Sequence, residues 1–310
     1  MTKKVAVLMG GCSSERGVSL SSGKNVLKAL EEAGYDAFSL DLSHDLTAFV
    51  ETLKKEKPDV VFNALHGQYG EDGCVQGVLD IMQIPYTHSG RLASALAMNK
   101  IMAKKLYRMA GLPVAVDRIV SKEDILAGNV LPHPFVLKPV SNGSSVGVYI
   151  FRENNGRKPF EGEKYPYADD DEIMAEEYVE GRELTVAVMN GKALGVLEIL
   201  PAEKFYNYKA KYSEGGAKHV IPANLPKEDY EKALYIAEEA HKVLGCRGIS
   251  RSDIRYDDMR PGQKPRFAIL ETNTQPGMTS LSLVPEIAQH AGFSYKDIVV
   301  WMVENAKWGE

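Results

Sequence analysis

The first 90 residues alternate between short apolar runs and segments in which apolar residues recur every three or four positions. Three runs have the length and composition of buried parallel strands: residues 5–9, 37–40 and 59–65. Between them, residues 21–33 and 46–55 have the spacing of amphipathic helices, which end at Gly34 and before Pro58. This alternation predicts a parallel, doubly wound α/β unit.

Two glycine-containing loops follow strands of this predicted sheet. Gly10 and Gly11 come directly after the first strand, and residues 66–73, which begin with His66, come after the third. Ligands of doubly wound sheets bind at the carboxyl ends of the strands. Both loops are therefore expected at the ligand-binding edge of the sheet.

From about residue 92 the pattern changes. Residues 93–108 predict one long helix, which carries Lys100. Short strands are predicted after it, at residues 134–139, 148–151, 173–179, 183–189 and 193–200. The pair Asn190-Gly191 signals a two-residue hairpin, which is an antiparallel feature. This α+β part is therefore expected to be separate from the first unit.

Two polar stretches are predicted to be loops. Residues 152–171 are rich in Gly, Pro and Asp and are expected to be an exposed loop. Residues 201–222 carry an aromatic and basic run and are too long for a tight connection, so we expect a functional lid. The chain then continues with a helix at residues 227–244, two strands and two closing helices.

Composition narrows the class of protein. Of the 310 residues, 44% are hydrophobic and 25% are charged, as in globular proteins with sizeable cores. The net charge is −5 and there is no long basic run, which argues against nucleic acid or a membrane surface as a partner. No signal peptide or membrane-spanning run is recognisable. Three cysteines without a Cys-x-x-Cys pair predict reduced thiols and a cytoplasmic protein.

Three oxygen-bearing side chains near the end of the chain predict a metal site. Glu271 and Asn273 follow an apolar, strand-like run, and residues two apart on a strand point to the same side. Asp253, from a neighbouring strand, adds a second carboxylate. Hard oxygen ligands of this kind suit Mg²⁺, which commonly accompanies phosphates.

A glycine- and serine-rich loop, residues 143–147, follows the strand that ends near Lys138. Such a loop is either a plain hairpin turn or a cradle for phosphate. Lys138, with Lys100 as a second ammonium, favours the cradle, and the metal site makes ATP with Mg²⁺ the expected ligand. Residues 22–25 lack the spacing of a P-loop, and residues 10–14 lack a dinucleotide fingerprint. ATP is therefore expected to bind by another architecture.

Six segments together make a specific resemblance. They are residues 10–19, 66–73, 98–100, 138–147, 206–212 and 251–283. In their order and approximate spacing they resemble the D-alanine–D-alanine ligases of the ATP-grasp superfamily, from end to end. The resemblance implies an N-terminal Rossmann-like substrate domain (1–92) and two ATP-grasp subdomains, a central one (93–179) and a C-terminal one (180–310) with the lid and the metal site.

The resemblance also implies a nucleotide site between the two ATP-grasp subdomains. Residues expected to bind ATP are Lys100, Lys138, Ser145, Glu176, Glu177, Tyr178, Val179, Glu183 and Lys211. The lysines would contact phosphates, Glu176 to Val179 would form the adenine hinge, and Glu183 would bind the ribose. Asp253, Glu271 and Asn273 would hold two Mg²⁺ ions, for which Mn²⁺ can substitute.

The remaining roles concern the two D-alanine molecules. Residues expected to contact them or to take part in catalysis are Glu15, Val18, His66, Ser144, Tyr212, Arg251, Gly277, Ser282 and Leu283. Glu15 would bind the first ammonium, and Ser144 and Tyr212 would link it to the lid and assist deprotonation of the attacking amine. Arg251 would bind the second carboxylate with Ser282 and the Leu283 N–H, and with the Gly277 N–H it would stabilise the oxyanion.

Several alternatives stay open on the sequence alone. Glu15 and Arg16 could form a surface ion pair, His66 could be structural, and Glu176 and Glu177 could be a solvated strand pair. The second substrate could be D-lactate or D-serine, although Tyr212 favours an amine nucleophile. A non-catalytic nucleotide-binding protein and a metal hydrolase are the other classes. The family implies a cytoplasmic homodimer that supplies peptidoglycan precursors.

Overall fold

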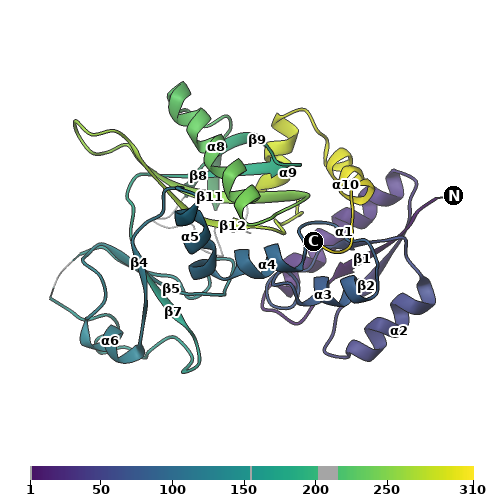
Figure 1. Ribbon diagram of the computed structural model, residues 1–310, viewed down its shortest axis with the longest axis horizontal. Coiled ribbons are helices and arrows are strands. Elements are labelled where there is room, and N and C mark those ends of the chain that lie inside the picture. The colour runs from purple at the N-terminus through teal and green to yellow at the C-terminus, as the bar shows by residue number, and fades with distance from the viewer. Residues whose placement is uncertain (1, 154–155, 202–215) are drawn as a thin grey trace.

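The computed structural model describes residues 2–153, 156–201 and 216–310. Three sheets, of three, four and five strands, lie side by side in these ranges (Figure 1). Within the same ranges, no helix is long and apolar enough to cross a membrane.

The three-stranded sheet is parallel, as predicted, with β1 (Lys4–Met9) between β2 (Asp36–Asp41) and β3 (Val60–Asn63). The helices of this unit are α1 (Arg16–Glu32), α2 (Leu46–Glu56) and α3 (Cys74–Ile81). The predicted start of the first helix at residue 21 is wrong by about one turn, and α3 was not predicted.

The early start of α1 has a physical reason that hydrophobic spacing does not reveal. The first turns bury Val18 together with the polar residues Ser19 and Ser22. The Ser19 hydroxyl donates to the Ala64 carbonyl at 2.8 Å, so this buried polar group is satisfied. A serine-bearing face therefore packs like an apolar one.

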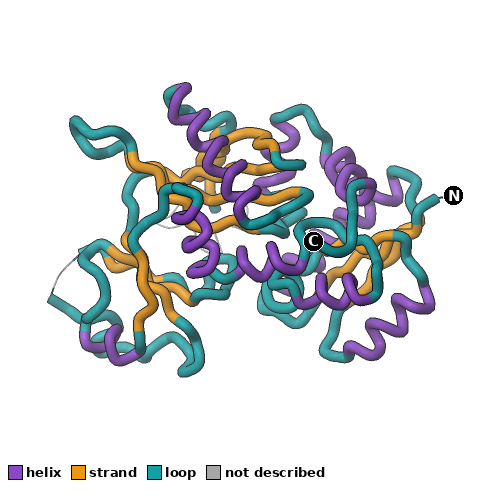
Figure 2. The backbone as a smooth tube through the Cα atoms, viewed as in Figure 1, coloured by secondary structure: helices purple, strands orange, loops and turns teal. Residues whose placement is uncertain are grey.

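The four-stranded sheet is antiparallel and has the order β4-β7-β5-β6. Its strands are β4 (Asp117–Val120), β5 (Phe135–Pro139), β6 (Tyr149–Phe151) and β7 (Ile173–Glu177), with the short helix α6 (Lys122–Ala127) beside them. The expectation that residues 152–171 are simply exposed is wrong in part. Phe160 and Tyr167 of this stretch are buried and pack edge-to-face with Tyr149. Their rings belong to one hydrophobic cluster with residues of β4, β5 and β7. In Figure 2 this sheet has few helices beside it.

The five-stranded sheet has the order β10-β9-β8-β11-β12. Its strands are β8 (Arg182–Met189), β9 (Lys192–Pro201), β10 (Ala217–Val220), β11 (Ile249–Asp257) and β12 (Arg266–Asn273), covered by α8 (Lys227–Val243). Asn190 and Gly191 both have positive φ, of 52° and 74°, which confirms the predicted hairpin. Of the predicted lid, residues 202–215 lie outside the described residues, and residues 217–220 form the edge strand β10.

The single long helix predicted for residues 93–108 is wrong. The chain forms α4 (Arg91–Met98) and α5 (Lys100–Met109), which meet at Asn99. Asn99 has extended backbone angles (φ −86°, ψ 99°), and its side chain accepts a hydrogen bond from the Met102 N–H at 3.0 Å. It is therefore the N-cap of a new helix, and it makes Lys100 the first residue of α5.

The end of the chain returns to its beginning. Helices α9 (Leu283–His290) and α10 (Tyr295–Glu304) share one hydrophobic core with β1, α1 and the five-stranded sheet. In Figure 1 the yellow helix α10 lies beside the purple helix α1. The edge of the parallel sheet is thereby fixed next to the strands that carry Asp253 and Glu271.

Candidate active site

Two cavities meet where the three sheets come together. The first is lined by predicted substrate and metal residues, namely Glu15, His66, Ser144, Arg251, Asp253, Glu271, Asn273, Gly277, Ser282 and Leu283. The second is lined by predicted nucleotide residues, namely Lys138, Ser145, Glu176, Glu177, Tyr178, Val179 and Glu183. Lys100, Asn142, Asp253 and Glu271 line both cavities. A molecule in one cavity is therefore adjacent to a molecule in the other.

Glu15 lies immediately before α1 and is only 6% exposed. Its carboxylate accepts a hydrogen bond from the Ser144 hydroxyl, so a residue of the N-terminal unit is joined to the glycine-serine loop. Arg16 instead pairs with Asp41, which excludes the reading of Glu15 and Arg16 as a surface ion pair.

The glycines beside Glu15 leave room for its carboxylate. A Cβ added to Gly67 would lie 3.0 Å from Glu15 Oε2, and one added to Gly143 would lie 3.1 Å from it. Ser144 and Ser145 both have positive φ, of 52° and 59°. Non-glycine residues in this region are strained and often mark functional loops.

Glu71 is a second buried carboxylate in the first cavity, and the sequence reasoning gave it no role. The Gly67 N–H donates to Glu71 Oε1 at 2.5 Å. Burial, and then repulsion from Glu15, raise the pKa of Glu71 to about 8. The sequence did offer one signal for Glu71, since it is an acidic residue in a glycine-rich loop that follows a strand. The proximity of Glu15 to it depends on the fold.

His66 is buried in the wall of the same cavity. Its Nε2 lies 3.3 Å from the Ser22 hydroxyl. Burial, and then the charge of Arg251, lower the pKa of His66 to about 4. The imidazole is therefore neutral at pH 7, so it can donate one hydrogen bond and accept another without adding positive charge to the cavity.

Arg251 and Asp253 lie two residues apart on β11 and face each other, as the strand period predicts. Arg251 donates to both carboxylate oxygens of Asp253, at 2.9 and 2.8 Å. Thr185 on β8 donates to the same carboxylate at 2.7 Å. The anion beside Arg251 is thus Asp253 itself, in a bidentate pair.

Glu271 and Asn273 line the cavity from β12, where Glu271 is paired in register with Asp253. Glu271 lies 3.3 Å from the Lys100 ammonium, which also donates to the Asn142 carbonyl at 2.6 Å. Asn273 Oδ1 accepts from the Gln275 N–H at 2.7 Å. Carboxylate and amide oxygens fit Mg²⁺ or Mn²⁺ in kind.

This donor set is small for an all-protein metal site. Within residues 2–153, 156–201 and 216–310, no three His, Cys, Asp or Glu residues are grouped so as to hold a metal. Asp253 and Glu271 also each have a cationic partner. The residues present therefore fit a metal that brings further ligands, such as phosphate oxygens, with it.

The far wall of the first cavity is the start of α9. Ser282 precedes this helix and Leu283 is its first residue, so backbone N–H groups without helical acceptors face this region. The Ser282 hydroxyl accepts from the Thr279 N–H at 2.9 Å, and a Cβ on Gly277 would come within 2.8 Å of it. Val18, by contrast, is buried in α1 and is not among the residues that line the first cavity.

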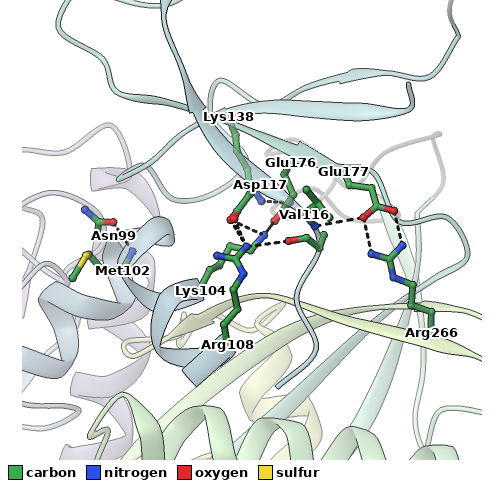
Figure 3. Close-up of polar contacts among 11 residues, drawn as sticks. Asn99, Met102, Lys104, Arg108, Val116, Asp117, Lys138, Glu176, Glu177 and Arg266 are labelled. Atoms are coloured by element: carbon green, nitrogen blue, oxygen red, sulfur yellow. Dashed lines mark hydrogen bonds and ion pairs between the residues drawn. The ribbon is translucent and has the colours of Figure 1, made fainter. Parts of the chain in front are cut away.

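In the second cavity Glu176 is not a solvated strand residue. It is 2% exposed, and Lys138 donates to its carboxylate at 2.6 Å. Lys104, from α5, donates to the other oxygen (Figure 3). Burial opposes ionisation, but the two lysines outweigh it and lower the pKa of Glu176 to about 2.

The residues predicted to form the adenine hinge are tied to the five-stranded sheet by two arginines. Arg266 on β12 binds both carboxylate oxygens of Glu177 at 2.5 and 2.6 Å (Figure 3). The Tyr178 N–H donates to the Pro134 carbonyl at 3.0 Å. Arg255 donates to the Val179 carbonyl at 2.9 Å and to Glu183 at 3.4 Å.

The chain matches one protein family over nearly its whole length. The family model described as "D-ala D-ala ligase N-terminus" matches residues 4–57 and 41–89, and that described as "D-ala D-ala ligase C-terminus" matches residues 106–304. A D-alanine–D-alanine ligase of Paramagnetospirillum magneticum is 52% identical over 307 residues, 99% of each chain. One of Parvibaculum lavamentivorans is 54% identical over 304 residues, 98% of this chain and 97% of the relative.

The chain belongs to the D-alanine–D-alanine ligase family. A solved structure of the Bacillus anthracis D-alanine–D-alanine ligase complexed with ATP is similar to this chain, with a TM-score of 0.78 and 30% sequence identity. The match covers 98% of this chain and 96% of the Bacillus anthracis chain. The expected ATP-grasp fold and family are thus confirmed.

Two residues for which the sequence predicted a role lie in a part of the chain that the structure does not describe. Tyr212 and Lys211 lie in residues 202–215, outside the described residues, so their roles remain predictions. Lys104, by contrast, lies beside the predicted nucleotide residues but was not predicted from the sequence. It lies within the predicted helix at residues 93–108, and only the packing of α5 brings it to Glu176.

Proposed function

We propose that this ligase uses ATP to join two D-alanine molecules through a D-alanyl phosphate. The observation that carries this proposal is the set of residues common to both cavities, which includes Lys100, Asp253 and Glu271. An amino acid beside Glu15 and a nucleotide beside Lys138 can meet at these residues. The D-alanine carboxylate must lie next to the γ-phosphate of ATP, because a carboxylate is a poor electrophile until it is phosphorylated.

The proposed reaction has two steps. A carboxylate oxygen of the first D-alanine attacks the γ-phosphorus of ATP, and ADP leaves. The amine of the second D-alanine then attacks the acyl carbon, loses a proton, and expels inorganic phosphate. The phosphate carries away the oxygen that bridged carbon and phosphorus, and a peptide bond remains.

The side chains of the first cavity suit the two amino acids. Glu15 is placed to bind the first ammonium, and Ser144, which donates to Glu15, holds that carboxylate in position. Arg251, Ser282 and the Leu283 N–H suit the carboxylate of the second D-alanine. The Gly277 N–H and Arg251 suit the oxyanion that forms when the amine attacks the acyl carbon. A neutral His66 borders the first substrate. Tyr212 of the predicted lid completes this set.

For the nucleotide, we assign Lys100, Lys138 and Lys211 to the phosphates and Ser145 to the loop above them. Glu176, Glu177, Tyr178 and Val179 form the adenine hinge, and Glu183 binds the ribose. Asp253, Glu271 and Asn273 would hold Mg²⁺, two ions per site, or Mn²⁺, which neutralises phosphate oxygens when bound. Since Asp253 is paired with Arg251, binding a cation at Asp253 and a carboxylate at Arg251 should favour each other.

We further propose the division into domains 1–92, 93–179 and 180–310, with residues 201–222 as the lid. The protein would act in the cytoplasm as a homodimer and supply peptidoglycan precursors. Its three cysteines, Cys12, Cys74 and Cys246, are free thiols, which suits a reducing compartment.

The test is ATP turnover with and without D-alanine. ADP release should require D-alanine, and one dipeptide should form per ADP. Turnover of ATP that is independent of D-alanine would reject the proposal. To identify the second substrate, D-lactate or D-serine is supplied in competition with D-alanine over a range of pH, and the products are compared. Formation of mainly ester would overturn the assignment of an amine nucleophile.

A further inference from the structure

The face of α5 carries three basic residues at four-residue intervals: Lys100, Lys104 and Arg108. Lys100 reaches the junction of the two cavities. The next two reach a mostly buried group of charges behind the nucleotide cavity, in which Lys104, Arg108 and Asp117 have no role above. We call this group the α5 charge cluster, and its members are Lys104, Arg108, Asp117, Lys138 and Glu176 (Figure 3).

The cluster is a connected chain of ion pairs. Arg108 donates to Asp117 Oδ2 at 2.6 Å, and Asp117 Oδ2 lies 3.9 Å from the Lys104 ammonium. Lys104 donates to Glu176, and Glu176 accepts a second hydrogen bond, of 2.6 Å, from Lys138. The side chain of Lys104 is 0% exposed, so its charge acts only through these neighbours.

The charges in the cluster do not balance. Three cations face two carboxylates, so one positive charge is in excess. Lys104 is enclosed and Arg108 is used by Asp117, whereas Lys138 lines the nucleotide cavity. The excess charge is therefore presented to the nucleotide cavity by Lys138, where an anion can complete the cluster.

We infer that Lys104 is a positioning residue for the nucleotide: it neutralises Glu176 from behind, so that the charge of Lys138 remains available to phosphate. Without Lys104, Lys138 would be the one cation paired with the buried carboxylate of Glu176 among the described residues. Because a buried carboxylate needs a paired cation, Lys138 would then be held by Glu176. This inference deepens the proposed function, on which it rests.

The effect should appear in nucleotide affinity. Lys104→Met should raise the dissociation constant of a non-hydrolysable ATP analogue, measured by calorimetry without D-alanine, by about tenfold or more. Lys104→Arg, which keeps the charge, should retain most of the affinity. Lys105→Met removes a charge from the exposed side of the same helix and should leave affinity unchanged. Unchanged affinity in Lys104→Met would overturn the inference.

A second pair of variants separates charge balance from simple damage. In a Glu176→Gln background the carboxylate is gone, so removing Lys104 should change affinity less than about threefold. This comparison still decides the matter if Lys104→Met alone does not fold, because the double variant has no unpaired buried carboxylate. A loss of equal size in both backgrounds, or a loss above tenfold in the Glu176→Gln background, would show that Lys104 does not act through Glu176.

Failure of this inference can be distinguished from failure of the proposed function. If the wild-type chain binds the analogue but makes no dipeptide, the proposed function fails while the role of Lys104 can stand. If it makes dipeptide and the variants bind the analogue as tightly as wild type, only the role of Lys104 fails.

Discussion

At the scale of single residues, the sequence predicted charges of the site that lie two apart on one strand, but not those that are brought together across the fold. The two-residue period of a strand was enough to place Arg251 beside Asp253 and Glu271 beside Asn273. Lys104 and Glu71 were not predicted, because their partners are far away in the sequence. Contacts of that kind depend on how elements pack, which local patterns do not encode.

Arg251 provides the first test at this scale. Arg251→Lys keeps a charge but loses the planar pair of donors that suits a carboxylate. We expect the KM for D-alanine to rise at least about tenfold, while the affinity for an ATP analogue changes little. Steady-state kinetics and calorimetry measure the two quantities. Unaltered D-alanine kinetics would remove Arg251 from the substrate site.

Glu71 provides the second test at the scale of single residues. Its pKa is raised from 4.5 to about 8, so between these values the folded chain keeps a proton that the unfolded chain releases. The free energy of unfolding should therefore fall as pH rises through this window, by at most roughly 1.4 kcal/mol per pH unit. His66, with a pKa lowered to about 4, acts in the opposite sense, but only below its ordinary value of 6.5.

The comparison is best made between pH 6.5 and 8, where Glu71 acts without His66. Glu71→Gln should gain stability relative to wild type as pH rises, as measured by urea unfolding. Glu51→Gln, at an exposed position of α2, is the control and should follow wild type. A constant difference between Glu71→Gln and wild type across this range would contradict the raised pKa.

At the scale of elements, the sequence predicted most strands and helices but not where one helix gives way to another. Residues 93–108 have a continuous helical pattern, yet Asn99 ends α4 and caps α5. A cap needs one side-chain hydrogen bond, which leaves no trace in the spacing of apolar residues. Similarly, the aromatic rings of Phe160 and Tyr167 were hidden in a polar stretch.

Asn99 tests this interpretation. Asn99→Ala should lower the free energy of unfolding by about 1 kcal/mol, because the Met102 N–H loses its acceptor. Asn99→Asp can accept the same hydrogen bond and should retain most of the stability. Urea unfolding measures both. Equal losses in the two variants would mean that the cap does not hold α5.

At the scale of the whole molecule, the site exists because the chain folds back on itself. The core shared by β1, α1, α9 and α10 brings the loop of Glu15 next to strands that lie more than 230 residues later. α5 lies between the four- and five-stranded sheets, with Lys104 paired to the first and Tyr107 hydrogen-bonded to Thr272 of the second. Neither arrangement can be read from local patterns, although the family resemblance implied the fold that contains them.

The central claim is that the amino acid and the nucleotide meet across Lys100, Asp253 and Glu271, so that a carboxylate oxygen takes the γ-phosphoryl group. The most direct measurement uses D-alanine labelled with ¹⁸O in both carboxylate oxygens, with mass spectrometry of the phosphate and dipeptide. Each phosphate released should carry one ¹⁸O from the first D-alanine. Phosphate without label, alongside normal dipeptide formation, would contradict the claim.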